Sequence, residues 1–333
     1  MYNSTIIGLG FYVPDNTVTN NDLSELMDTS DEWIRERTGI KERRWVNDDK
    51  LTTSLMGTYA AERAIVDSGI EKKDIDFIIF STLSPDYYFP GSGVLLQRNL
   101  EIKEIGALDI RNQCSGFIYG LSIADQYIKS GMYKNILVVG SELHSGGLDK
   151  STKGRSVSVI FGDGAGAAVV SATTSSSGIL STHLHSEGKF AEELAVIKPA
   201  TSFWIDKIKA EKNKDDSSYF PYMNGNFVFK NAVLRFEEVI FEGLNHSNLK
   251  KEDISLLITH QANLRISQYI QKRLNLSDSQ VFNNIMKYGN TTAASIPIAL
   301  TEAYKSNLIK KGDIVVLAAF GSGFTWGSAI IKW

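Results

Sequence analysis

The chain has 333 residues, of which 43% are hydrophobic and 22% charged, with a formal net charge of −3. This composition is typical of a globular protein with one large domain or two fused halves, and the balanced charge argues against nucleic-acid binding, which needs a basic surface. A single cysteine excludes an internal disulfide and fits a reducing compartment, and no apolar run approaches the roughly 20 residues of a membrane span.

The first predicted element is a strand that ends before Pro14. The opening "MYNSTIIGLGFYVPDN" lacks the basic n-region of a secretory signal peptide, so we expect a cytoplasmic protein that does not insert into membranes. Residues 52–69, "TTSLMGTYAAERAIVDSG", have apolar residues at helical spacing and Gly69 at the end, which predicts a helix. Residues 225–247 show the same pattern later in the chain.

Two pairs of segments indicate an internal duplication. "KKDIDFIIFST" (72–82) resembles "KKEDISLLITH" (250–260), and "KSGMYKNILVVGSE" (129–142) resembles "KSNLIKKGDIVVLAAF" (305–320). Both pairs are offset by nearly the same number of residues, and each consists of a polar turn followed by an apolar strand. Such strands, alternating with helices, predict two mostly parallel sheets that are buried on both faces. We expect an N-terminal half of residues 1–172 and a C-terminal half of residues 173–333.

A third echo pairs "VIFGDGAGAAVVSA" (159–172) with "AAFGSGFTWGSAIIKW" (318–333). The glycines of "FGDGAGA" do not indicate a nucleotide site, because a strand rather than a helix is predicted after them and the Lys-Ser/Thr pair of a P-loop is missing. We interpret them as a tight turn between two strands.

Residues 198–222, "KPATSFWIDKIKAEKNKDDSSYFPY", are charged, aromatic and without a clear period. Long loops in compact proteins are often functional, so this excursion is interpreted either as a lid over a pocket or as a solvated loop.

The only cysteine, Cys114, lies between an apolar strand and a predicted helix in "DIRNQCSGFIYG" (109–120). At a helix N-terminus, free N–H groups and the helix dipole stabilise a thiolate and lower the thiol pKa, and the same N–H groups can bind an oxyanion. Lone cysteines are also often inert core residues, so position alone leaves both interpretations open.

His260 and Asn290 favour catalysis. His260 closes the apolar strand "ISLLITH", and ligands of open α/β sheets gather at the carboxyl ends of strands. The duplication aligns Asn290 with the segment that carries Cys114, so we expect the three residues to meet. The other four histidines, among them His144, are predicted to lie in polar or loop-like surroundings.

The motifs "QCSGF" around Cys114, "THQANLRI" around His260 and "YGNTTAASIP" around Asn290 resemble the Cys-His-Asn triad of the β-ketoacyl-acyl-carrier-protein synthase III family. "TSDEWIRERTGI" (29–40), "FGDGAGA" (161–167) and "GSGFTWGSA" (321–329) also resemble that family, in the same order and along the whole chain. The resemblance implies a five-layer αβαβα thiolase fold of two duplicated halves, and a homodimer.

The resemblance implies a decarboxylating Claisen condensation that initiates fatty acid synthesis. Cys114 would take the acyl group of an acyl-CoA, and His260 and Asn290 would stabilise the enolate formed from malonyl-acyl carrier protein. The Cys114 N–H and the turn Gly321-Ser322-Gly323 would form an oxyanion site, although the family usually has three glycines there. The reaction requires no metal or redox cofactor, and the sequence has no Cys/His cluster with metal-ligand spacing.

The same matching implies binding residues. The residues for coenzyme A would be Trp33, Arg37, Arg155, Asn226 and Asn263. Phe89 would close the partner subunit's acyl pocket. The basic residues for the acidic carrier protein would be Lys230, Arg265, Lys272 and Arg273.

Three alternatives remain open at this stage. The first is a specialised synthase III relative that condenses longer or unusual acyl groups into polyketide or resorcinol-type products. It is favoured by the 198–222 excursion and by Gln113, where small residues are usual. The others, a papain-like hydrolase and a non-catalytic partner subunit, fit less well, because the former is not a duplicated α/β chain and the latter usually loses a triad residue.

Overall fold

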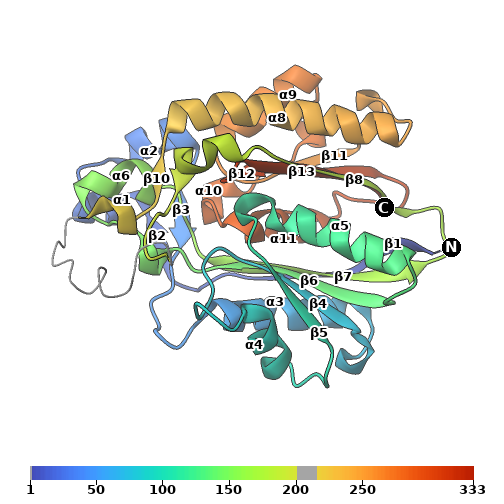
Figure 1. Cartoon of the computed structure of the whole chain (residues 1–333). Coiled ribbons are helices and arrows are strands. Elements are labelled where there is room, and N and C mark those ends of the chain that lie inside the picture. The colour runs from blue at the N-terminus through green and yellow to red at the C-terminus, as the bar shows by residue number, and fades with distance from the viewer. Residues whose placement is uncertain (1, 201–215) are drawn as a thin grey trace.

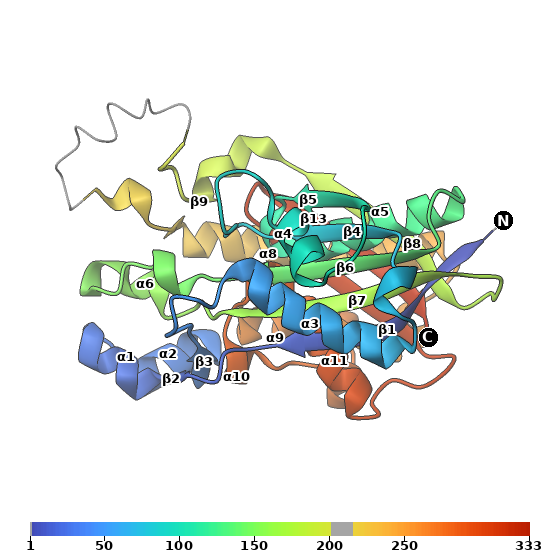
Figure 2. The ribbon, with the colours of Figure 1, turned by 90° about the horizontal axis from the view of Figure 1, so that it is seen from below.

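The computed structural model describes residues 2–200 and 216–333. Two sheets and three helical layers alternate along one direction, as Figure 1 shows from the side. Figure 2 looks along that direction from below, with α3 and α4 in front of the first sheet. The five-layer αβαβα arrangement expected from the sequence is therefore confirmed. Within the described residues, no helix combines the length and the apolar character needed to cross a bilayer.

The first sheet has five strands. Their order is β1 (Asn3–Tyr12), β7 (Gly164–Thr173), β6 (Asn135–Glu142), β4 (Phe77–Ser81) and β5 (Gly106–Ile110). Strands β6, β4 and β5 are parallel, whereas β7 runs antiparallel to both β6 and β1. All residues of β4 and β6 are buried, which explains their unbroken apolar sequences.

The second sheet repeats this plan with four strands. Their order is β11 (Leu256–Thr259), β12 (Ile314–Gly321), β13 (Thr325–Lys332) and β8 (Gly178–Ser186). Among neighbouring strands of this sheet, only β11 and β12 are parallel, and the other two pairs are antiparallel. The strands β11, β12, β13 and β8 therefore run in the same relative directions as β4, β6, β7 and β1. An isolated parallel bridge between Leu257 and Val281 stands where β5 pairs with β4 in the first sheet. The equal topology is the structural counterpart of the repeated sequence segments.

Three pairs of helices make the other layers. Helices α3 (Thr53–Ser68) and α4 (Ser92–Asn99) cover the outer face of the first sheet, and α8 (Gly225–His246) and α9 (Leu264–Leu274) cover that of the second (Figure 1). Between the sheets lie α5 (Gly116–Lys129) and α11 (Ser295–Lys305). Buried residues of α5 and α11 pack against both sheets in one apolar cluster, which fixes the starts of these two helices relative to each other.

The helix boundaries follow from local sequence. Thr52 caps α3 by accepting a hydrogen bond from the Leu55 N–H, and Gly69 ends the helix in the left-handed region at φ 74°. Both predicted helices, 52–69 and 225–247, therefore agree with the structure to within a residue or two.

The remaining short elements gather at one end of the molecule (Figure 1). They are β2 (Thr17–Thr19), α1 (Asn20–Leu26), α2 (Asp31–Thr38), β3 (Glu42–Arg44), α6 (Arg155–Ser158), β9 (Leu194–Ala195), β10 (Tyr222–Met223) and α10 (Ile285–Tyr288).

Two sequence predictions change here. Strand β7 begins at Gly164 and so contains two of the three glycines of 161–167, and the short helix α6 rather than a strand precedes them, so the expected turn between two strands was wrong. Within the 198–222 excursion, residues 201–215 lie outside the described part. Its base is the β9–β10 pair, closed by an ion pair of 2.8 Å between Lys198 Nζ and Asp216 Oδ2.

Candidate active site

A cavity of about 500 Å³ opens at the end of the molecule where the short elements gather. Cys114, His260 and Asn290 all line it, together with Gly321. The three residues predicted from three distant motifs therefore face one space. Because Cys114 comes from the first half and the others come from the second, this space exists only when the two halves pack together.

Cys114 sits in a 3₁₀ turn, Gln113–Ser115, between β5 and α5. Gln113 has a left-handed backbone, with φ 42°. Gly321, at the end of β12, lies against this cysteine. A Cβ atom built on Gly321 would be 2.8 Å from the Cys114 Sγ and 2.5 Å from the Cys114 Cβ. The turn after β12 can approach the sulfur this closely only because residue 321 has no side chain.

The thiol is not ionised in the resting protein. Burial, followed by the nearby carboxylate of Glu142, raises the pKa of Cys114 to about 12. The sequence-based expectation of a lowered pKa was therefore wrong, because removal from water outweighs the helix start. The backbone N–H groups of Ser322 and of Cys114 itself act in the opposite direction and favour the thiolate. Of the 321–323 turn, the structure thus brings the Ser322 N–H to the sulfur.

His260 follows β11 directly, and its backbone N–H donates to the Ala318 carbonyl of β12 at 2.8 Å. Its Nδ1 lies 2.6 Å from the Ser295 Oγ. The Gln261 N–H donates to that same oxygen, at 3.4 Å, so the Ser295 hydroxyl proton is free to point at Nδ1. With the hydroxyl proton in that direction, the imidazole carries its own proton on Nε2.

The Nε2 atom of His260 is buried and has no hydrogen-bond partner among the residues that the structure describes. Burial lowers the pKa of His260 to about 3, so the ring is neutral near pH 7. A neutral imidazole with an unpartnered N–H at a cavity is a hydrogen-bond donor waiting for a ligand.

Asn290 is held on both sides by backbone bonds. Its N–H donates to the Ile160 carbonyl at 2.9 Å, and its carbonyl accepts from the Gly162 N–H at 3.0 Å. Its side-chain oxygen accepts from the Thr292 N–H at 2.8 Å. Because the amide oxygen is occupied, the amide nitrogen is left as a donor. The site therefore presents two neutral side-chain donors, from His260 and Asn290, along with the sulfur.

Sequence reasoning missed two buried polar residues beside this site. Glu142 ends β6 with no exposure to solvent, and burial raises its pKa to about 7. His144 was expected in polar, loop-like surroundings, but it is buried and its Nε2 lies 2.5 Å from the Thr292 Oγ1. Only one feature of the sequence could have indicated them. They lie at the end of β6, and the duplication pairs β6 with β12, which ends at Gly321 in the site.

The residues matched to coenzyme A lie at the mouth of the same cavity. Trp33, Arg37, Asn226 and Asn263 line it. The guanidinium carbons of Arg37 and Arg155 lie 4.5 and 5.1 Å from the centre of the Trp33 ring. Asn263 caps α9 and donates to the Arg37 carbonyl at 2.9 Å, so it joins α9 to α2. The two arginines therefore converge on one indole.

The basic residues matched to the carrier protein lie on α8 and α9. Lys230, Arg265 and Lys272 are exposed, and Arg265 also lines the cavity. Arg273 differs, because its guanidinium makes two hydrogen bonds, of 2.8 and 3.0 Å, to the Glu237 carboxylate.

Phe89 does not line the Cys114 cavity of its own chain. It is 81% exposed, beside the exposed Tyr87 and Tyr88. The base of this segment is fixed, because the Asp86 carboxylate accepts hydrogen bonds from Ser54 and Ser92. The result is an anchored loop with three aromatic side chains in solvent.

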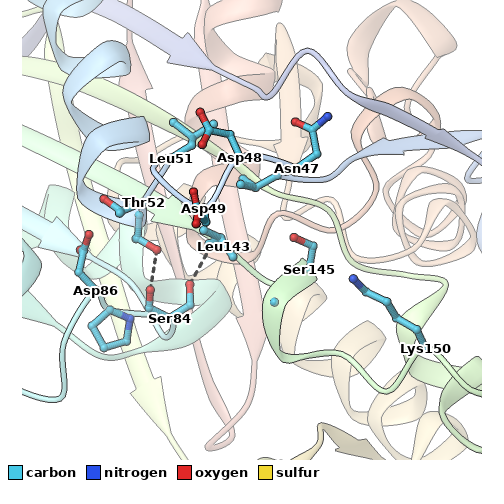
Figure 3. A pocket seen from close by; sticks show the side chains of 14 residues that line it. Asn47, Asp48, Asp49, Leu51, Thr52, Ser84, Asp86, Leu143, Ser145 and Lys150 are labelled. Atoms are coloured by element: carbon cyan, nitrogen blue, oxygen red, sulfur yellow. Dashed lines mark hydrogen bonds between the residues drawn. The ribbon is translucent and has the colours of Figure 1, made fainter.

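A second cavity, of about 530 Å³, adjoins this loop (Figure 3). Ser84 and Leu143 lie on its wall, and the Leu143 N–H donates to the Ser84 Oγ at 2.9 Å. The Ser84 hydroxyl donates to the Glu142 carboxylate at 2.7 Å. Hydrogen bonds thus connect this wall to Glu142, the carboxylate that helps to raise the pKa of Cys114.

Comparison with known proteins agrees with the geometry. The family model for 3-oxoacyl-[acyl-carrier-protein] synthase III matches residues 108–188, which include Cys114. The family model for the C-terminal part of that enzyme matches residues 244–333, which include His260 and Asn290. The β-ketoacyl-[acyl-carrier-protein] synthase III of Caldanaerobacter subterraneus is 45% identical over 328 residues, covering 98% of this chain and 97% of that protein. This chain belongs to the β-ketoacyl-[acyl-carrier-protein] synthase III family.

Solved structures of synthase III enzymes are similar throughout. The 3-oxoacyl-[acyl-carrier-protein] synthase III of Aquifex aeolicus superposes with a TM-score of 0.90 at 43% identity, covering 99% of this chain and all of that one. The priming β-ketosynthase of the R1128 polyketide pathway gives 0.89 at 30% identity, covering 99% and 96%. The thiolase-like fold is thereby confirmed, and this synthase III family member is an acyl-transferring condensing enzyme.

Proposed function

We propose that this enzyme condenses an acyl-CoA primer with malonyl-acyl carrier protein through an acyl group carried on Cys114, as the first condensation of fatty acid synthesis. The observation that carries the proposal is the convergence of the Cys114 thiol, the unpartnered His260 Nε2 and the Asn290 amide on one cavity.

In the first half-reaction, the Cys114 sulfur attacks the thioester carbonyl and coenzyme A leaves. The thiol proton ends on the released coenzyme A, so thioester exchange needs no net proton transfer to solvent. Negative charge moves from sulfur to the carbonyl oxygen during attack, and the N–H groups of Cys114 and Ser322 are suited to receive it. The high pKa of the resting thiol implies that it loses its proton only as the substrate arrives.

In the second half-reaction, malonyl thioester enters and loses carbon dioxide. The electron pair of the broken C–C bond becomes an enolate, whose oxygen would accept hydrogen bonds from His260 Nε2–H and from the Asn290 amide. The enolate carbon attacks the acyl-Cys114 carbonyl, and the cysteine sulfur leaves as a thiolate and takes one proton from solvent. Neither half-reaction transfers electrons to a redox centre or needs a Lewis acid, so we propose that no cofactor takes part.

Coenzyme A would enter past Trp33. An adenine ring that stacks on this indole must displace Arg37 or Arg155. Arg155 lies 3.5 Å from the Asp28 carboxylate and Arg37 4.0 Å from that of Glu36, so contacts with the phosphates of coenzyme A would replace these ion pairs. The carrier protein, which is acidic, would dock on Lys230, Arg265 and Lys272. Arg273 would contribute less than the sequence suggests, because its charge is paired with Glu237.

We also propose a homodimer in a reducing, cytoplasmic compartment. Strand β5 is a partly exposed sheet edge, which can pair with a second copy. The exposed Phe89 loop is the kind of apolar patch that marks an interface, and it would reach the partner's acyl pocket. A catalytic cysteine that must stay reduced supports the compartment.

The test is acylation with labelled acyl-CoAs from acetyl-CoA to long and branched chains, followed by malonyl-acyl carrier protein and mass spectrometry of the products. Label that stays on Cys114 until malonyl thioester is added supports the proposal, and release of free acid would indicate a hydrolase. Efficient products only from long or unusual primers would support the specialised alternative. The matched control is Cys114→Ala, which should take no label.

The two half-reactions can then be separated. His260→Ala or Asn290→Ala should slow decarboxylation by about 10²- to 10³-fold, the range for lost oxyanion donors, while Cys114 is still acylated. Equal loss of both steps in a folded variant contradicts this division. Arg265→Glu should mainly raise the KM for carrier protein, and an unchanged KM removes Arg265 from the docking surface.

A further inference from the structure

His144 is a buried histidine that the proposed reaction does not use. It follows β6 by two residues and is 7% exposed. Its neighbours Leu143 and Ser145 line the second cavity (Figure 3), whereas its ring stacks on Phe161 with 4.4 Å between ring centres. His144 itself lines neither of the two cavities described above. A role of His144 in the reaction would therefore act through its neighbours.

One of those neighbours is Thr292. The His144 Nε2 lies 2.5 Å from the Thr292 Oγ1, and the Thr292 N–H donates to the Asn290 Oδ1 at 2.8 Å. Two short hydrogen bonds thus lead from the imidazole to the amide that faces the cavity. Breaking the first would loosen the residue that makes the second.

Thr292 needs such support because its backbone is unfavourable. Its φ is +51°, a left-handed conformation that β-branched residues rarely adopt unless their surroundings impose it. The Ala293 N–H, next in the chain, donates to Glu142, so the strand end that carries His144 also holds the following residue. His144 and Glu142 therefore make hydrogen bonds to two consecutive residues of this turn, Thr292 and Ala293.

Phe161 closes the arrangement on the other side. Its main chain forms the bridge with Asn290, and its ring lines the Cys114 cavity. The hydrogen bonds of this bridge join Asn290 to Ile160 and Gly162, the two chain neighbours of Phe161. The imidazole is thus packed between the ring of the residue that bridges to the Asn290 main chain and the residue whose N–H holds the Asn290 side chain. This is a placement from which one side chain can set the direction of the Asn290 amide.

We propose that His144 is a positioning residue for decarboxylation: it holds the Thr292 hydroxyl, and thereby the Thr292 N–H that aims the Asn290 amide at the malonyl thioester. The inference rests on the proposed function, since it assumes that role for Asn290. Burial lowers the pKa of His144 to about 3, which keeps the ring neutral and adds no charge beside His260.

The test uses variants that separate the hydrogen bond from the shape. His144→Phe keeps an aromatic ring on Phe161 but loses the nitrogen, and Thr292→Val keeps the branched shape but loses the hydroxyl. The conservative partners are His144→Gln, whose amide reaches a similar point, and Thr292→Ser. Each is assayed for Cys114 acylation by the best acyl-CoA of the panel and for decarboxylation of malonyl-acyl carrier protein, with the thermal unfolding midpoint as a folding check.

His144→Phe and Thr292→Val should each slow decarboxylation about tenfold, the scale of one weakened oxyanion donor, and change acylation less than about twofold. The double variant should be no slower than either single one, because both remove the same contact. His144→Gln and Thr292→Ser should retain most of the rate. If His144→Phe does not fold, Thr292→Val against Thr292→Ser decides the question.

Independent, multiplying effects in the double variant, or equal loss of both half-reactions, would overturn the inference. Full decarboxylation by a folded His144→Phe enzyme would do the same. Asn290→Ala separates this failure from failure of the proposed function. If Asn290→Ala leaves decarboxylation intact, the role of Asn290 itself is wrong, whereas a slow Asn290→Ala with a normal His144→Phe rejects only the part assigned to His144.

Discussion

Ser295 is placed to select the tautomer of His260 in which Nε2 carries the proton, and its replacement by alanine tests that assignment. The Ser295 Oγ is 2.6 Å from Nδ1, both groups are buried, and the opposite nitrogen has no hydrogen-bond partner within residues 2–200 and 216–333. In Ser295→Ala, either tautomer leaves Nδ1 without a hydrogen bond. The free energy that favours a proton on Nε2 is therefore lost, and His260 spends more time unable to donate to the enolate.

The size of the effect follows from that one bond. Leaving a buried polar atom unpaired costs about 1–3 kcal/mol, and roughly 1.4 kcal/mol corresponds to a factor of ten in rate. Decarboxylation should therefore slow by roughly 5- to 100-fold. Acylation of Cys114 should change far less, because that step relies on the N–H groups of Cys114 and Ser322.

The assay is single-turnover acylation and malonyl decarboxylation, measured separately on the same preparation. Thr301→Ala is the matched control, since Thr301 is a buried hydroxyl on the same helix α11 that donates to the Pro297 carbonyl at 2.6 Å, away from His260. If Ser295→Ala decarboxylates as fast as Thr301→Ala, or loses acylation equally, the tautomer argument is refuted.

Three further predictions follow from the site. Gly321→Ala places a methyl group 2.5 Å from the Cys114 Cβ, so overpacking of about 1–3 kcal/mol should lower the unfolding midpoint and abolish most acylation, unlike Gly147→Ala, which meets nothing within 4 Å. A normal acylation rate in Gly321→Ala would contradict the geometry. Trp33→Ala should raise the KM for acyl-CoA about tenfold, as expected for a lost base–aromatic stack, and leave acyl-pantetheine unaffected; equal losses with both substrates would argue against adenine stacking. Glu142→Gln removes a negative charge that raises the pKa of Cys114, so the rise of acylation rate with pH should move to lower pH. An unchanged pH profile in the folded variant would count against that electrostatic link.

Much of the fold could be predicted because the duplication is written in the sequence. Phe77 and Leu256 begin equivalent strands at the offset read from "KKDIDFIIFST" and "KKEDISLLITH". The same offset aligned Asn290 with the Cys114 segment, which is how three distant motifs could be expected in one cavity. Periodic apolar residues and end signals such as Gly69 were enough to place the long helices.

Predictions failed where the outcome depended on packing between distant residues. His144 is polar and follows a strand, which favours an exposed loop, yet Phe161 and Thr292 enclose it. The helix α6 before "FGDGAGA" replaced an expected strand, since a short apolar run does not distinguish the two. Neither the burial of His144 nor the formation of α6 is indicated by the residues next to it in the chain.

The sequence by itself determined the family and the duplicated five-layer fold, and it singled out Cys114, His260 and Asn290 as candidates, because residue types and spacing along the chain carry that information. Only the tertiary structure decided the electrostatics. The protonated state of Cys114, the neutral state of His260 and the contact of its Nδ1 with Ser295 all depend on how far each group is removed from water and on which atoms surround it. Those surroundings come from segments separated along the chain, by 35 residues for His260 and Ser295 and across the two halves for Cys114 and Ser322, so they exist only once the chain has folded.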